Sequence, residues 1–409
     1  MERPTVLALI LAGGKGSRLG ALTDHVVKPA LPVGGTYRLI DISLSNLAHS
    51  HISDVWMVQQ YLPYSLNKYL ANGRPWDLDR SHGGLQILPP YEGSHGEGFA
   101  SGNSDSIYRQ AELIREADPD LVLVLSADHL YTVDFRNVIN THLTKRADLT
   151  MVTTHVHEDT SRYSVVETDE SGAVTSFAYK PEDPPSQIVA GEMFLFNTDK
   201  LLSALDTLQD ELGQLADYGE DLIPYFMDHH AVFEHRHLGY WMDLGTIQSY
   251  WTAQMQLIDG NGATLDDPNW PIWTGHVPLL PGFVNDGAAV TNSYVAPGAR
   301  VAGTVEHSVI GQNCVIEAGA VVRNSVLLDN VHVGSTVELI NVVADSGAEI
   351  TGGTQRGSSQ AITLIDRGGT VSQRDDSALT RIACQTAARR ARSTSCYEHV
   401  SCSHIFPIS

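Results

Sequence analysis

The chain has 409 residues, of which 42% are hydrophobic and 18% charged, and this composition favours a folded protein with a large buried core over a disordered one. Its formal net charge of -22 at pH 7 makes nucleic acid and anionic membrane surfaces unfavourable partners. Its four cysteines (Cys314, Cys384, Cys396 and Cys402) do not form the close pairs of a metal site. A cytoplasmic protein with free thiols is therefore expected.

The first predicted element is an apolar run, Val6 to Leu11, with the character of a strand buried on both faces of a sheet. The run is too short to span a membrane and leads into a glycine-rich turn, so we interpret it as a strand and not as a signal peptide. Similar runs recur, separated by helical patterns such as 104–116, at 55–58, 121–125, 149–153 and 193–196. This alternation predicts an α/β domain over residues 1–258 with a mainly parallel sheet.

A different pattern follows. Residues 259–285 are rich in Asp, Gly and Pro and are predicted to form a linker or capping segment. From 286 to 355, aliphatic residues recur every six positions, as at Val309, Val315, Val321, Leu327, Val333 and Leu339. This recurrence predicts a parallel β-helix of hexapeptide repeats, with an ordinary β-meander as the less favoured alternative. Residues 356–409 are expected to be a tail, poorly ordered in part.

The strongest chemical signal is the segment Leu11-Ala-Gly-Gly-Lys-Gly-Ser-Arg-Leu19, followed by Lys28-Pro29-Ala30. Glycines let backbone N–H groups approach phosphates closely, while Arg18 offers a planar fork for oxyanions and Lys28 a point charge. The glycine spacing matches neither the dinucleotide fingerprint nor a Walker loop. The segment is therefore predicted to bind a triphosphate.

Two aspartates follow apolar stretches, Asp128 in Leu123-Val-Leu-Ser-Ala-Asp-His and Asp243 in Tyr240-Trp-Met-Asp-Leu-Gly. Ligands of open α/β sheets bind at the carboxyl ends of strands, and carboxylates there suit a Mg²⁺ ion. The alternative for each aspartate is a helix cap. Lys180, held beside Pro181, is a weaker candidate, because surface lysines are far commoner than ligand lysines.

Together these motifs resemble the sugar nucleotidyltransferases, and within that family the bacterial glucose-1-phosphate adenylyltransferases. The resemblance covers residues 5 to about 350. Besides the segments quoted above, it is carried by Tyr37-Arg-Leu-Ile-Asp41, Leu44-Ser-Asn46, Gln60-Tyr61, Asp128-His129-Leu-Tyr131, Lys180-Pro181, Asp217-Tyr-Gly-Glu-Asp-Leu-Ile-Pro224 and Tyr240-Trp-Met-Asp-Leu-Gly-Thr246.

The resemblance implies a Rossmann-like catalytic domain, a left-handed β-helix, and usually a homotetramer. It implies transfer of a nucleotidyl group from a nucleoside triphosphate, ATP favoured, to a hexose 1-phosphate, glucose 1-phosphate favoured. The product would serve glycogen or related glycan synthesis. By the same resemblance Arg18, Lys28 and Asp128 are catalytic, and Asp128 and Asp243 hold Mg²⁺.

The resemblance also suggests binding residues. The nucleotide-binding candidates are Leu11, Ala12, Gly13, Gly14, Gln60 and Gly102, and the sugar-phosphate candidates are Tyr179, Lys180 and Glu192. The chain departs from the family on the sugar side, with Tyr163-Ser-Val for Phe-Gly-Val, Tyr179 for Glu, Ala190-Gly-Glu192 for Ser-Met-Gly, and Ala100-Ser-Gly-Asn-Ser-Asp105 for Tyr-Arg-Gly-Thr-Ala-Asp.

Several alternatives remain open. Because Glu192 could pair with an ammonium group, glucosamine 1-phosphate, with UTP or ATP, is one candidate substrate. Side chains near Leu85–Pro89 do not decide between the two bases. A non-catalytic regulatory subunit is a second possibility, although the chain keeps the glycine-rich loop and both aspartates. A hexapeptide acyltransferase is a third, for which His307 and His332 are the available histidines.

Overall fold

The computed structural model describes residues 3–13, 16–89, 100–275, 279–352 and 354–375. The chain divides into two compact units, the first formed by residues 1–245 and 256–279, the second by 246–255 and the residues from 280 onward. The helices and strands between residues 6 and 258 are β1 (Val6–Ala12), η1 (Ser17–Thr23), η2 (Lys28–Ala30), β2 (Pro32–Val33), β3 (Tyr37–Arg38), α1 (Leu39–His49), β4 (Asp54–Gln59), α2 (Pro63–Leu70), η3 (Ala71–Trp76), β5 (Gly84–Leu88), α3 (Asn103–Tyr108), α4 (Ala111–Ala117), β6 (Leu121–Ser126), β7 (His129–Tyr131), α5 (Phe135–Lys145), β8 (Leu149–His155), β9 (Ser164–Thr168), β10 (Val174–Tyr179), β11 (Ile188–Asn197), α6 (Thr198–Leu212), α7 (Leu222–His229), β12 (Val232–Arg236), β13 (Trp241–Asp243) and α8 (Ile247–Ile258).

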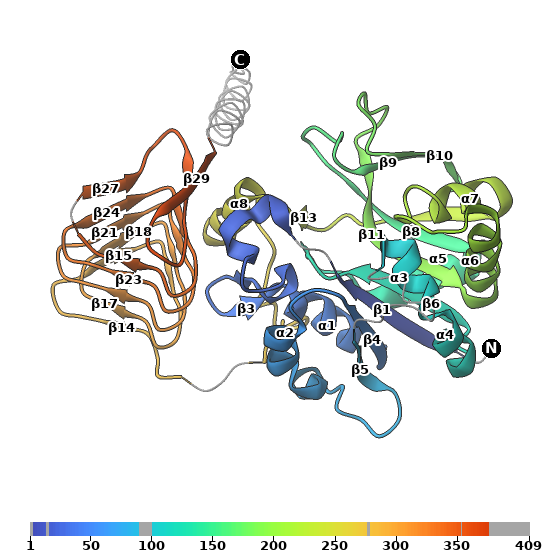
Figure 1. Ribbon diagram of the computed structural model, residues 1–409, viewed down its shortest axis with the longest axis horizontal. Coiled ribbons are helices and arrows are strands. Elements are labelled where there is room, and N and C mark those ends of the chain that lie inside the picture. Colours follow the sequence, from blue (N-terminus) through green and yellow to red (C-terminus); the bar gives the residue numbers. More distant parts are fainter. Residues whose placement is uncertain (1–2, 14–15, 90–99, 276–278, 353, 376–409) are drawn as a thin grey trace, which may run out of the picture. The chain divides into compact units, whose positions relative to one another are not determined.

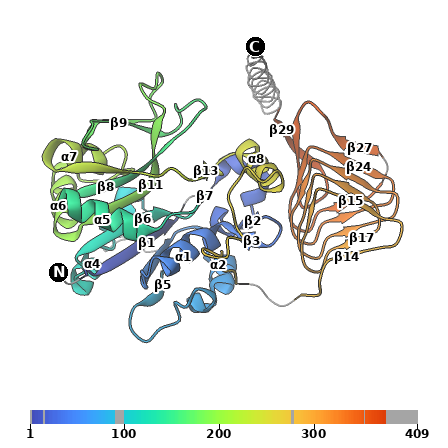
Figure 2. The same cartoon turned by 180° about the vertical axis from the view of Figure 1, so that it is seen from behind.

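The first unit is built on a nine-stranded sheet, which Figures 1 and 2 show from opposite sides. Strands β5, β4, β1 and β6 run parallel in that order, as the continuous apolar runs predict. The long strand β11 then pairs antiparallel with both β6 and β8. The predicted Rossmann-like α/β domain is thus confirmed, and its sheet is mixed beyond β6.

The side chains of strand β1 are buried on both faces of the sheet. Leu7 and Leu9 pack in one buried cluster with side chains from α3, α4, α6 and α7. Ala8 and Ile10 point the other way, and both are fully buried as well. The loop that follows β1 therefore leaves the sheet at the carboxyl end of a strand held rigidly by packing on either side.

A separate two-stranded ribbon carries both candidate metal ligands. Strand β13 pairs antiparallel with β7, so that Asp243 lies opposite His129. Because Asp128 directly precedes β7, residues more than a hundred positions apart in the chain become neighbours just beyond the end of β6.

Residues 256–279, predicted to belong mostly to a linker, cluster with the first unit. The Trp270 indole N–H donates to Asn46 Oδ1 at 2.7 Å, and the Trp273 backbone N–H donates to Ser45 Oγ at 2.9 Å. These bonds fasten the segment to α1.

The second unit is a parallel β-helix with three sheets, visible as stacked coils in Figure 1. Its strands are β14 (Phe283–Val284), β15 (Ala289–Thr291), β16 (Tyr294–Val295), β17 (Arg300–Val301), β18 (Thr304–Glu306), β19 (Val309–Ile310), β20 (Val315–Ile316), β21 (Val321–Arg323), β22 (Val326–Leu327), β23 (His332–Val333), β24 (Val337–Ile340), β25 (Val342–Ala344), β26 (Glu349–Ile350), β27 (Thr354–Gly357), β28 (Ile362–Ile365) and β29 (Val371–Asp375). The parallel pairing of strands from successive coils is the pairing expected of the predicted left-handed hexapeptide β-helix. Strands continue past the boundary predicted at residue 355, and residues 376–409 of the predicted tail lie outside the described part.

The side chains that fill the coils differ from a strict six-residue series. Val309 pairs with Val326 and Val326 with Val343, so these two coils take 17 residues each, one fewer than three hexapeptides, whereas the coil from Tyr294 to Val309 takes 15. Ile316 is accordingly buried, whereas Val315 keeps 37% of its surface exposed. Within the described residues, no helix combines the length and apolar character needed to cross a membrane.

Candidate active site

The glycine-rich turn opens onto a cavity of about 220 Å³, which we call the loop cavity. It is lined by Leu11, Ala12, Gly13, Gly16, Ser17, Arg18, Lys28, Pro29, Asn103, Ser126, Asp128, Glu192, Tyr218 and Gly245. The structure therefore brings together most of the predicted phosphate, metal and sugar residues. Gly14 lies outside the described residues.

Lys28 bridges the two predicted metal ligands. Its Nζ lies 2.6 Å from Asp128 Oδ2 and 3.1 Å from Asp243 Oδ1, and only 5% of the residue is exposed. Burial alone would lower the pKa of Lys28, but the two carboxylates outweigh it and hold the pKa above its usual value. Burial likewise opposes ionisation of Asp128, yet Lys28, with His129, keeps the pKa of that carboxyl well below its usual value. The ammonium form of Lys28 and the carboxylate form of Asp128 therefore prevail.

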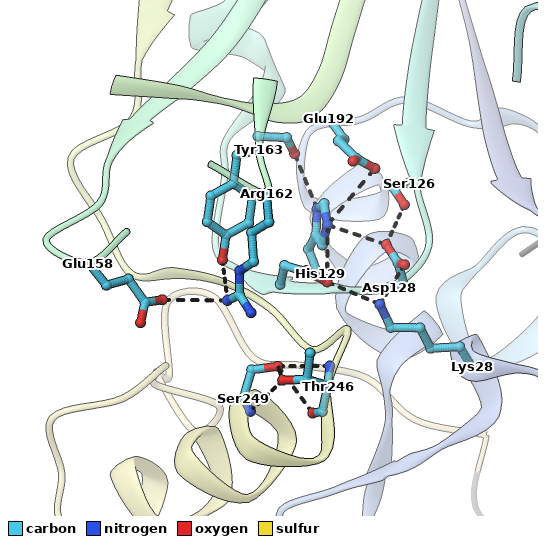
Figure 3. A network of polar contacts seen from close by, with 12 residues as sticks. Lys28, Ser126, Asp128, His129, Glu158, Arg162, Tyr163, Glu192, Thr246 and Ser249 are labelled. Atoms are coloured by element: carbon cyan, nitrogen blue, oxygen red, sulfur yellow. Dashed lines mark hydrogen bonds and ion pairs between the residues drawn. The ribbon is translucent and has the colours of Figure 1, made fainter. Parts of the chain in front are cut away.

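His129 lies between Asp128 and Glu192 and contacts both, as Figure 3 shows. It is 3% exposed, and its Nε2 lies 3.4 Å from Asp128 Oδ1 and 3.7 Å from Asp243 Oδ1. Its Nδ1 lies 3.3 Å from the Gly191 carbonyl oxygen, and Trp241 packs edge-on against the ring at 5.0 Å between centroids. Ligand atoms of Asp128, His129 and Asp243 all lie within 4.8 Å of one another, a spacing that suits a single metal ion.

Arg18 faces the same group from η1. A Cβ placed on Gly245 would lie 2.7 Å from Asp243 Oδ2 and 3.0 Å from Arg18 Nη2. The missing side chain at Gly245 thus lets the carboxylate and the guanidinium approach the chain. Arg18 itself is exposed, so its fork is available to an oxyanion entering the cavity.

The predicted nucleotide-binding residues outside the cavity lie close by. Gln60 covers Gly13, because a Cβ on Gly13 would meet the Gln60 side chain at 3.3 Å. Gln60 Nε2 also donates to Ser106 Oγ at 2.6 Å, which ties the end of β4 to α3. Gly102 precedes α3, and a Cβ there would lie 2.2 Å from the Ala216 carbonyl oxygen. Close backbone packing is thus a sufficient reason for glycine at position 102.

Of the three predicted sugar-phosphate residues, Glu192 lines the loop cavity, and Tyr179 and Lys180 do not. Lys180 is exposed, and its Nζ contacts the Tyr179 hydroxyl and lies 4.2 Å from the centroid of that ring. Tyr179 packs over Gly219, and burial, with the nearby Asp217 carboxylate, raises its pKa above the usual value. Neither residue lines the loop cavity as described.

Glu192, in contrast, reaches the cavity from a bulge in β11. Its Oε2 lies 3.9 Å from His129 Nε2, as seen in Figure 3, and its carboxylate also hydrogen-bonds with Tyr218. Burial raises the pKa of Glu192 above its usual value. The cavity thus has a carboxylate on its sugar side that is separate from the metal pair.

Sequence reasoning overlooked three groups that take part in the site. His129 and Tyr218 both stand inside quoted motifs, but no role was attached to them. Ser126, at the end of β6, donates a short hydrogen bond to Asp128 Oδ1. The sequence offered one signal for them. His129 and Ser126 lie within two residues of Asp128, and Tyr218 lies in the motif that begins at Asp217.

Comparisons with known proteins agree with this geometry. The family profile described as nucleotidyl transferase matches residues 7–260, and the profile described as GlmU-like, C-terminal hexapeptide matches residues 283–368. A glucose-1-phosphate adenylyltransferase of Thermotoga maritima is 40% identical over 321 residues, covering 78% of this chain and 76% of the relative. The protein of that name from Bacillus mycoides is 35% identical over 356 residues, covering 86% and 95%. One from Lachnospira eligens is 40% identical over 320 residues, covering 78% and 75%.

Proposed function

This chain belongs to the nucleotidyl transferase family, and we propose that it transfers the adenylyl group of ATP to a hexose 1-phosphate, with glucose 1-phosphate as the first candidate. The products are a nucleotide sugar, of use in glycogen or related glycan synthesis, and pyrophosphate. The observation that carries the proposal is the convergence of Arg18, Lys28 and Asp128 on one cavity beside the glycine-rich turn, with Asp243 paired to Lys28. The relatives are glucose-1-phosphate adenylyltransferases, which supports the choice of ATP and glucose 1-phosphate.

The chemistry asks for positioning and charge neutralisation. A phosphate oxygen of the sugar 1-phosphate, already ionised at neutral pH, attacks the α-phosphorus of the nucleotide. The bond from that phosphorus to the bridging oxygen breaks, and pyrophosphate leaves with the electron pair. No strong general base is needed. Arg18 and the backbone N–H groups of the turn hold the phosphates, and Lys28 offsets the charge that develops on them.

The carboxylate pair fits a divalent cation such as Mg²⁺. Asp128 and Asp243 supply the oxygen ligands that this ion prefers, and in their present arrangement the ammonium group of Lys28 acts as a stand-in cation between them. When bound, the ion would supply Lewis-acid stabilisation of phosphate charge. The nitrogen of His129 is a poorer ligand for Mg²⁺, so we assign it a positioning role.

A matrix of sugar 1-phosphates against nucleoside triphosphates, read by released pyrophosphate, tests the proposal. We expect the highest turnover with ATP and a hexose 1-phosphate in the presence of Mg²⁺. A pure protein without turnover in any combination would support the rival function, a regulatory subunit, and would refute catalysis.

We further propose a homotetramer working in the cytoplasm. The first coil of the β-helix exposes Leu280, Phe283, Val284 and Tyr294, and a row of large apolar side chains at a coil edge is typical of a subunit contact. Light scattering in solution should give the mass of four chains. A monomeric mass at micromolar concentration would contradict this part of the proposal.

A further inference from the structure

Glu192 has an unusual backbone conformation. Its φ is +54°, in the left-handed region that favours glycine, at the point where the pairing of β11 with β8 shifts register between Ala190 and Phe194. Such strain is retained where the surrounding structure uses it, and active sites are common examples. The bulge places the Glu192 carboxylate at the wall of the loop cavity.

The carboxylate of Glu192 has no strong cationic partner among the described residues. Its one ion-pair neighbour within 4.0 Å is His129, at 3.9 Å, which is too long for a hydrogen bond. The nearby lysine, Lys28, is already shared by Asp128 and Asp243. A third carboxylate therefore faces a cavity that must receive phosphates, and a positive charge on the sugar would give this carboxylate the close partner that the described residues do not supply.

We propose that Glu192 is a specificity-determining residue that recognises an ammonium group on the sugar, so that the protein accepts 2-amino-2-deoxyhexose 1-phosphates such as glucosamine 1-phosphate. This inference rests on the proposed function, because it takes the loop cavity to be the place of reaction. An ammonium–carboxylate pair in a partly buried site is a charge-assisted contact that a neutral hydroxyl cannot equal.

The position of the ammonium group follows from connectivity. The sugar phosphate must bring an oxygen to the α-phosphorus, which is held near Lys28 and the aspartate pair. Carbon 2 is bonded to the carbon that carries the phosphate, so its substituent lies near the reacting end. Glu192 Oε2 lies 3.9 Å from the ring of His129, which contacts both aspartates, and is thus placed to meet that substituent.

The experiment compares kcat/KM for glucosamine 1-phosphate, glucose 1-phosphate and N-acetylglucosamine 1-phosphate, each with ATP and with UTP, in wild-type protein and two variants. Glu192→Gln keeps the shape and removes the charge, while Glu192→Gly also removes the strain at positive φ and so protects the test against misfolding. Glu167→Gln, at an exposed position of β9, is the matched control.

We expect both Glu192 variants to lower kcat/KM for glucosamine 1-phosphate about tenfold more than for glucose 1-phosphate, mainly through KM. Glu167→Gln should leave the ratio unchanged, and the neutral N-acetyl substrate should gain nothing from Glu192. Turnover of glucose 1-phosphate but not of glucosamine 1-phosphate by the wild type would overturn the inference and leave the proposed function standing. Equal losses for both sugars in the variants would also overturn it. Failure of every pair would refute the proposed function itself.

Discussion

The two sides of the loop cavity are organised differently. On the metal side, the Nζ of Lys28 lies within 3.1 Å of a carboxylate oxygen of both Asp128 and Asp243, and the three side chains are largely buried. On the proposed sugar side, Lys180 lies outside the lining of the cavity, is exposed, and contacts only its neighbour Tyr179 among the contacts described for its ammonium group. The difference teaches that the charge pairing of Lys28 with the two aspartates is built into the fold, whereas the contact proposed between Lys180 and a sugar phosphate is not assembled in advance.

The largest effect is expected from Asp128→Asn, which keeps the shape of the side chain and removes its charge. Because charge stabilisation dominates this chemistry, kcat should fall about 100- to 1,000-fold with little loss of folded structure. Steady-state pyrophosphate release and circular dichroism measure the two effects, and the exposed Asp118→Asn serves as control. Unchanged turnover would remove Asp128 from the mechanism.

A somewhat smaller effect is expected from Lys28→Met. The variant loses the cation shared by two carboxylates, so kcat should fall about 100-fold. Its thermal midpoint without Mg²⁺ should also drop, because Asp128 and Asp243 then repel each other. Adding Mg²⁺ should raise the thermal midpoint of the variant by more than it raises that of the wild type. The comparison is sharpened by Lys145→Met, which removes a lysine that contacts only Ser171 and Phe233 in the structure described. Equal responses of Lys28→Met and wild type to Mg²⁺ would argue against a shared cation site.

Lys180→Met tests the sugar side. If this lysine engages the sugar phosphate only after binding begins, KM for the sugar 1-phosphate should rise about tenfold while KM for ATP changes little. Lys200→Met, on the surface of α6, is the control. A fall in kcat as large as that of Lys28→Met would show that the two sides of the cavity are equally organised in advance.

The last prediction concerns stability and a buried aspartate for which no lysine neighbour is found among the described residues. Asp41 is fully buried, caps α1 and accepts hydrogen bonds from the Tyr69 hydroxyl, and burial raises its pKa to about 7 from 3.8. A raised pKa contributes stability that is complete below pH 3.8 and is lost as pH rises towards 7, the reverse of Asp128.

Asp41→Asn should remove this dependence. The wild type should lose about 2 kcal/mol of unfolding free energy relative to the variant between pH 5 and 7, and almost nothing more above pH 8. Urea titrations at several pH values measure the difference. A gap between the two proteins that stays constant with pH would show that Asp41 is not the titrating group.

Much of the fold could be predicted because its signals are local. The apolar runs of β1 and β6 and the aliphatic recurrence of the coils both follow from burial along a short stretch of chain. The phase of the coils could not be obtained in this way. A six-residue count favours Val315, but Ile316 is the buried residue, since strand pairing, with steps of 15 and 17 residues on either side of Val315, and not six-residue spacing sets the register.

The same distinction between local sequence signals and long-range strand pairing applies to the candidate site. The glycine-rich turn with Arg18 and Lys28 is nearly contiguous, and the structure places it around one cavity. The neighbourhood of Asp128 and Asp243 depends on the pairing of β7 with β13, which no local pattern reveals. His129 escaped notice for the same reason, because its ring meets Asp243 only through that ribbon.

The most direct test of the central claim is the position of a divalent ion in crystals of the protein with a non-hydrolysable ATP analogue and Mn²⁺, located by anomalous scattering. We predict one peak between the carboxylates of Asp128 and Asp243, with the α-phosphate beside it and the Lys28 ammonium moved onto the phosphates. A nucleotide bound away from the glycine-rich turn, or a peak that touches neither aspartate, would contradict the account.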